Sequence, residues 1–144
     1  MIELNGALRL AALPALIGAG LLLAAACGDD DDPDPEVARI GGVSELATYA
    51  YTDAGAEGLY DYLSSDVTEA CTMEQVAAAL AEHEQPTGWQ QIKDVEFHGE
   101  DEATGTVILI YRTDRQEEEW EFVREGTSWR INGVPGLEAC ESAE

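Results

Sequence analysis

The pattern of hydrophobic and polar residues predicts three helices in the first part of the chain after residue 36. The first has an apolar stripe at the helical spacing i, i+3, i+4, i+7, made of Val43, Leu46, Ala47 and Ala50. Gly41 and Gly42 come directly before this stripe. Because glycine is a poor helix former, we expect the helix to begin after them.

Two shorter helices are expected next. Asp53 is a suitable N-cap for the second helix, in which Leu59 and Leu63 share a face. Residues 72–75 read Thr-Met-Glu-Gln, a capping-box pattern that predicts the start of the third helix. Residues 85–88 read Gln-Pro-Thr-Gly and should end it, because proline and glycine interrupt helices.

Four strands follow these helices. Segments 94–97, 119–124 and 128–132 alternate apolar with polar residues, and segment 106–112 is apolar enough to be a central strand. Helices followed by consecutive strands indicate an α+β fold, with three helices packed against a curved four-stranded antiparallel sheet. Residues 117–119, three glutamates in a row, are interpreted as a solvated edge that discourages pairing between sheets.

Residues 10–26 form a 17-residue stretch without a charged side chain. A membrane-spanning helix needs roughly 20 apolar residues, and this stretch also contains Pro14, Gly18 and Gly20. It is therefore more typical of a signal peptide, over residues 1–26, than of a permanent anchor, which is the alternative interpretation.

Residues 23–27, Leu-Ala-Ala-Ala-Cys, resemble the lipobox of bacterial lipoproteins. This resemblance implies cleavage before Cys27, attachment of diacylglycerol to its thiol and a place in the bacterial cell envelope, on the extracytoplasmic side of a membrane. The segment departs from the usual pattern, with Ala24 where leucine is typical. Ala24 and Ala26 also form an A-x-A site, at which an ordinary signal peptidase would release a soluble protein.

Residues 27–36 then act as a tether. They contain four consecutive aspartates and two prolines and have no large apolar side chain to bury, so we expect an extended, solvated segment. The spacing of these aspartates is not that of an EF-hand calcium loop. Residues 37–144 form the single folded domain.

The charge balance excludes nucleic acid as a partner. Seven lysine and arginine residues against thirty acidic residues give a net charge of −23, which repels phosphates and anionic lipid headgroups. The chain has three cysteines. If Cys27 is acylated, Cys71 and Cys140 are left as an even pair, and we expect them to form a disulfide in an oxidising envelope.

Two further segments carry a resemblance to a known fold. Residues 48–66 (TYAYTDAGAEGLYDYLSSD) and 120–133 (WEFVREGTSWRING) resemble the opening helices and the last hairpin of the nuclear-transport-factor-2-like superfamily, which includes ketosteroid isomerases. The resemblance implies a cone-shaped α+β domain whose sheet curls around the helices and leaves an apolar pocket. The expected wall of that pocket is Leu46, Ala50, Leu63, Val95, Phe97, Leu109, Tyr111, Trp120, Phe122 and Trp129.

Enzymes of that superfamily place a general base, usually Asp or His, in the pocket. Asp53, Asp94 and His98 are the weak candidates here, and none of them lies in a recognisable catalytic motif. No His or Cys pair has the spacing of a zinc site, and no phosphate-binding loop is present, so we expect neither a metal nor a cofactor.

Three functions are compatible with these features. The first is a membrane-tethered binding or accessory module for a small apolar ligand or an envelope protein. The second is an isomerase- or cyclase-like enzyme with acid-base residues in the same pocket, and the third is a structural interaction domain with a filled pocket. An acidic side chain in an open pocket would favour the enzyme. The sequence leaves the ligand and the choice between monomer and dimer open.

Overall fold

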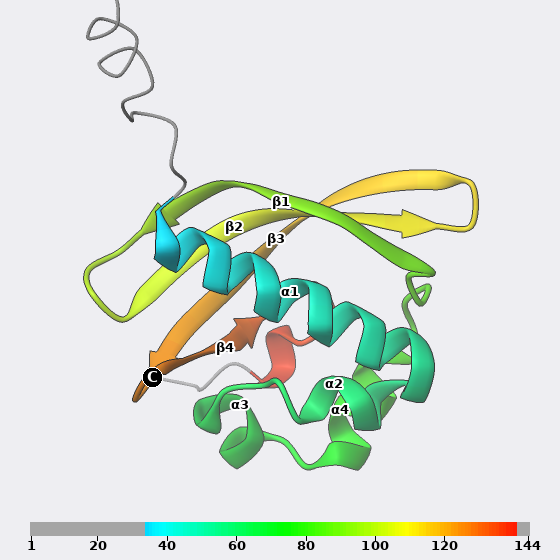
Figure 1. Ribbon diagram of the computed structural model, residues 1–144. Helices are drawn as coiled ribbons and strands as arrows, with labels where there is room; N and C mark the ends of the chain where they lie inside the picture. Colours follow the sequence, from blue (N-terminus) through cyan, green and yellow to red (C-terminus); the bar gives the residue numbers. More distant parts are fainter. Residues whose placement is uncertain (1–33, 141–144) are drawn as a thin grey trace, which may run out of the picture. The chain divides into compact units, whose positions relative to one another are not determined.

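The computed structural model describes residues 34–140, which form an α+β fold (Figure 1). The elements are α1 (Pro35–Ala54), α2 (Ala56–Tyr60), α3 (Ser65–Ala70), α4 (Met73–Leu80), β1 (Gly88–Phe97), β2 (Glu102–Tyr111), β3 (Asp114–Glu125), β4 (Ser128–Gly133) and the 3-10 helix η1 (Glu138–Cys140). The strands form one open antiparallel sheet in the order β1-β2-β3-β4. The predicted α+β class and four-stranded antiparallel sheet are confirmed, whereas the described residues contain four α-helices rather than three.

Helix α1 begins earlier than predicted and passes through the glycine pair. Asp34 caps it by accepting a hydrogen bond from the backbone N–H of Glu36 (2.9 Å), and Pro35 occupies the first turn, where a proline is well tolerated. Ile40 is completely buried. The burial of Ile40 and Gly41 and the cap at Asp34 outweigh the poor helix propensity of Gly41 and Gly42, so the expectation of a start after them was wrong. Residues 35–36 of the expected tether belong to α1.

The buried face of α1 is rotated from the predicted stripe. Leu46 is 56% exposed, whereas Ser44 and Thr48 are almost completely buried. Their hydroxyl groups are satisfied within the helix: Ser44 Oγ donates to the carbonyl of Gly41 (2.8 Å) and Thr48 Oγ1 to that of Ser44 (2.7 Å). Ser44 Oγ also accepts from Trp89 Nε1 (3.0 Å). Small polar residues can therefore face the sheet without an unpaired group.

The shorter helices agree only in part with the prediction. Asp53 lies in the last turn of α1 and does not cap α2, which begins after Gly55 at a φ of 68°. Helix α3 was not anticipated. The capping box of α4 is confirmed, because Thr72 Oγ1 accepts from the N–H of Gln75 (3.3 Å) and Gln75 Oε1 accepts from the N–H of Thr72 (2.8 Å).

The sheet bends over α1, which lies along its inner face, while α2 and α4 lie near the carboxyl end of α1 and α3 lies near β4 and η1 (Figure 1). Val107, Leu109, Phe122 and Ile131 project from the inner face of the strands into the core and are almost fully buried. At the β4 edge, the backbone of residues 62–64 pairs with Ile131, so part of that edge is covered.

Cys71 and Cys140 lie side by side, with their Cα atoms 5.4 Å apart and their sulfur atoms at bonding distance. Both residues are buried. Cys71 ends α3 and Cys140 lies in η1, so the bond links the end of the described chain to the junction of α3 and α4. The structure thus brings together the pair expected from counting cysteines.

Among residues 34–140, no helix is long and apolar enough to cross a membrane. The expected signal peptide, Cys27 and most of the expected tether lie outside the described residues.

Candidate functional site

A cavity of about 110 Å³ lies between the carboxyl-terminal half of α1, the loop after α4 and the inner face of β2 and β3. Leu80 and Leu109, which are 6% and 1% exposed, form part of its apolar wall. His83, Glu84 and Gln116 also line the cavity and are exposed. Because its lining combines core residues with exposed ones, the cavity leads from the core to the surface.

Glu118 brings a carboxylate into the lining of this cavity. Its Oε1 atom accepts a hydrogen bond from the hydroxyl of Tyr111 (2.5 Å), and its Oε2 atom accepts one from the indole Nε1–H of Trp120 (3.2 Å). Tyr111 and Trp120 line the same cavity and are almost buried. The two hydrogen bonds hold the carboxylate in one orientation.

The environment of the cavity keeps its tyrosines protonated. Burial raises the pKa of Tyr111 well above its usual range, and the hydrogen bond to Glu118 and the negative charge of that residue raise it further. Burial also raises the pKa of Tyr51, with a smaller contribution from the charge of Glu118. Both phenols are therefore hydrogen-bond donors at neutral pH.

The geometry of the β2–β3 hairpin places Glu118 in the cavity. Alternate residues of a strand point to opposite faces of the sheet, so Glu118 shares the inner face with Trp120 and Phe122. Glu117 lies on the other face, where its carboxylate is 2.6 Å from the Nζ atom of Lys93. The interpretation of residues 117–119 as a solvated edge before the strand was wrong for Glu118, because β3 already begins at Asp114.

The residues expected to form the pocket wall are spread over three environments. Leu109, Tyr111 and Trp120 line the cavity. The buried core outside the lining contains Leu63, Phe122 and Trp129. The remaining four lie outside both the lining and the buried core: Leu46 and Phe97 are exposed, and Ala50 and Val95 are only partly buried.

The three candidate bases do not line this cavity. Asp53 is exposed on α1. Asp94 is exposed at a register shift of β1, where its φ of 52° is one that Asp tolerates better than most residues. His98 is exposed, with Nε2 3.0 Å from Thr104 Oγ1, and it lines a separate cavity of about 200 Å³. Residues 34–140 contain no group of His, Cys, Asp and Glu placed to hold a metal ion.

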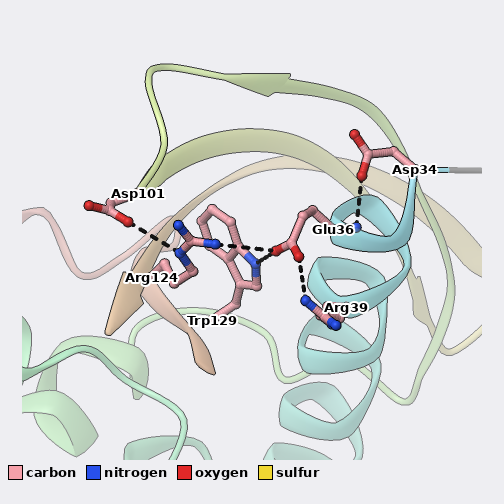
Figure 2. Close-up of polar contacts among 6 residues, drawn as sticks. All are labelled: Asp34, Glu36, Arg39, Asp101, Arg124 and Trp129. Atoms are coloured by element: carbon pink, nitrogen blue, oxygen red, sulfur yellow. Dashed lines mark hydrogen bonds and ion pairs between the residues drawn. The ribbon is translucent and has the colours of Figure 1, made fainter. Parts of the chain in front are cut away.

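A second polar cluster fastens the start of α1 to the sheet (Figure 2). The carboxylate of Glu36 accepts a hydrogen bond from Trp129 Nε1 (2.7 Å) and lies 4.0 Å from the guanidinium of Arg124. Arg124 also bonds Asp101 through Nε (3.2 Å), and its guanidinium lies 5.9 Å from the centre of the Trp129 ring. Every member has a partner within the cluster, so its arrangement fits a structural role at the point where the domain begins.

No protein-family model, curated protein or solved structure matches this sequence. The resemblance to the nuclear-transport-factor-2-like superfamily is therefore an expectation from the two quoted segments alone.

Proposed function

We propose that this protein is a membrane-tethered envelope lipoprotein whose α+β domain binds a small molecule in the cavity beneath the β2–β3 hairpin. The observation that carries the proposal is the cavity itself, which has a buried apolar wall and an exposed mouth. An interaction domain with a filled core would not need such a space. The membrane tether is inferred from the lipobox-like residues 23–27. The resemblance to the nuclear-transport-factor-2-like superfamily is part of the same proposal.

The dimensions of the cavity set the size of the ligand. At about 110 Å³ it is somewhat smaller than an engineered protein cavity of about 150 Å³ that binds benzene. A compact group of about four to six non-hydrogen atoms would therefore fill it, and a longer ligand would extend through the open mouth. The apolar wall would contribute roughly 25 cal/mol for each Å² of apolar ligand surface removed from water.

The second candidate function is acid-base catalysis in the same cavity. It is favoured by Glu118, an acidic side chain in an open cavity beside the phenol of Tyr111. However, the two groups that would act as base and acid are hydrogen-bonded to each other, and a substrate would have to displace that bond. Turnover that is abolished by Glu118→Gln in a folded protein would favour this second function over simple binding.

The binding function can be tested by isothermal titration calorimetry with neutral and cationic compounds of this size. Gln116→Trp is expected to abolish binding of any compound that wild type binds, because Gln116 is an exposed lining residue and a bulky ring there obstructs the mouth. Gln91→Trp adds the same ring to an exposed position of β1 outside the lining and should leave binding unchanged. Binding that survives Gln116→Trp would show that the ligand occupies another site.

A further inference from the structure

The cavity contains a negative charge that has only neutral hydrogen-bond partners. Glu118 accepts from a phenol and an indole, and no lysine, arginine or histidine within residues 34–140 forms an ion pair with it. Glu84, the other acidic residue of the lining, differs because it lies 3.6 Å from the guanidinium of Arg112. The charge of Glu118 is thus held in place but not compensated.

The neighbours of Glu118 favour the same kind of ligand. Tyr51, Tyr111 and Trp120 bring three aromatic rings to the lining. The face of such a ring attracts a cation, and this attraction strengthens when the site is shielded from water. The apolar residues Leu59, Leu80 and Leu109 complete a wall that suits hydrocarbon groups rather than a hydrated metal ion.

From this arrangement we propose that the cavity binds a small alkylammonium ion, a cation whose charge is surrounded by methyl or methylene groups. This proposal rests on the binding function proposed above and specifies its ligand class. In this proposal Glu118 supplies the opposite charge, the aromatic rings of the lining contact the cationic head, and the leucine side chains contact its carbon atoms. The net charge of the whole chain, −23, favours the approach of a cation.

Choline and neohexyl alcohol form a suitable pair of probes. In the alcohol, a carbon atom replaces the quaternary nitrogen, so the two molecules have the same shape and differ in charge. In calorimetry at about pH 8, where imidazoles are ordinarily neutral, wild type should bind choline about tenfold or more tightly than the alcohol, because only choline gains the charge and ring interactions. Added salt should weaken choline binding more than alcohol binding.

Two matched variants test the role of Glu118. Glu118→Gln removes its charge with little change of shape and should reduce the choline affinity about tenfold, the effect expected for losing a partly shielded charge, with alcohol binding unchanged. Glu119→Gln makes the same change of net charge on an exposed neighbour and should keep the preference for choline. Equal losses in both variants would overturn the proposal, because the preference would then come from the overall charge.

Even if Glu118→Gln fails to fold, the affinities of wild-type protein for choline and neohexyl alcohol test the proposed ligand class. Alcohol binding as tight as choline binding would overturn the ligand class and leave the binding function standing. If choline does not bind, the ligand class is also wrong. The binding function fails only if no neutral or cationic compound of the calorimetric series binds in a manner sensitive to Gln116→Trp.

Discussion

The burial of Tyr111, together with its hydrogen bond to Glu118, should make the stability of the domain sensitive to alkaline pH. Because the pKa of Tyr111 is raised in the folded state, the unfolded state loses this proton first as the pH rises above the ordinary tyrosine value of 10.0. The stabilisation is therefore complete below that pH and falls progressively above it. Tyr111→Phe should lower the free energy of unfolding by about 1 kcal/mol at neutral pH and make it less dependent on pH above 10.

Urea unfolding of the variant and wild type between neutral and alkaline pH measures both effects. Tyr49→Phe is the matched control, because Tyr49 is 49% exposed on α1 and should change neither the stability nor its pH dependence. If Tyr111→Phe and wild type lost stability in parallel above pH 10, the titration of Tyr111 would not be the cause of the loss.

The sequence indicated some side chains of the cavity, namely apolar or aromatic residues at alternating positions of a strand. Leu109, Tyr111 and Trp120 were expected in a pocket wall, and they line the cavity. Glu118 was missed because a run of three glutamates suggests a solvated surface. The spacing of two residues between Glu118 and Trp120 could have indicated that both side chains lie on the same face of a strand. Whether Glu118 belongs to the strand depends on the position of the β2–β3 turn, which a local sequence pattern does not fix.

Helix α2 can lie against α1 only because residue 58 is glycine. A Cβ atom at Gly58 would stand 2.1 Å from the carbonyl oxygen of Ala50, which is backbone and cannot move aside cheaply. Gly58→Ala should therefore destabilise the fold by about 3 kcal/mol or more, at the upper end of the usual overpacking cost. Gly42→Ala, in α1, has no atom within 4 Å of the new Cβ and should stabilise the fold by about 0.5–1 kcal/mol.

Thermal unfolding followed by circular dichroism compares the two alanine variants with wild type. The expected order of melting temperatures is Gly42→Ala, wild type, Gly58→Ala. A Gly58→Ala variant as stable as wild type would contradict this close packing of α2 on α1.

The helices were harder to predict than the strands for a physical reason. The predicted alternation survives folding in β3 and β4, which keep one face toward the core, whereas the register shift in β1 disrupts it near Val95 and Phe97. In α1 the apolar periodicity selected Leu46, whereas tertiary packing buries Ser44 and Thr48, whose hydroxyls bond within the helix. At Gly41 and Gly42 the poor helix propensity of glycine, about 1 kcal/mol per residue, is outweighed by the cap at Asp34 and the burial of Ile40 and Gly41.

The disulfide between Cys71 and Cys140 should stabilise the whole domain in the oxidising cell envelope proposed as its location. The bond between Cys71 and Cys140 joins residues 69 positions apart, and the chain-entropy estimate makes such a cross-link worth about 4 kcal/mol, less any strain. Reduction should therefore lower the melting temperature of the wild-type domain, and it should leave a Cys71→Ala/Cys140→Ala variant unaffected. An equal effect on both proteins would assign the loss to another cause.

The state of all three thiols in protein isolated from a bacterial membrane tests export, pairing and lipidation together. A thiol reagent applied to the denatured protein should label no cysteine before reduction and Cys71 and Cys140 after it, because Cys27 carries a thioether to diacylglycerol. Mass spectrometry should find an amino-terminal peptide that begins with the lipid-modified Cys27, and Cys27→Ser should abolish membrane retention. Three labelled cysteines after reduction, or a mature chain that begins after residue 27, would exclude the lipid anchor. Labelling of Cys71 and Cys140 without reduction would mean that the two cysteines do not form a disulfide. The protein would then reside in a compartment that keeps thiols reduced.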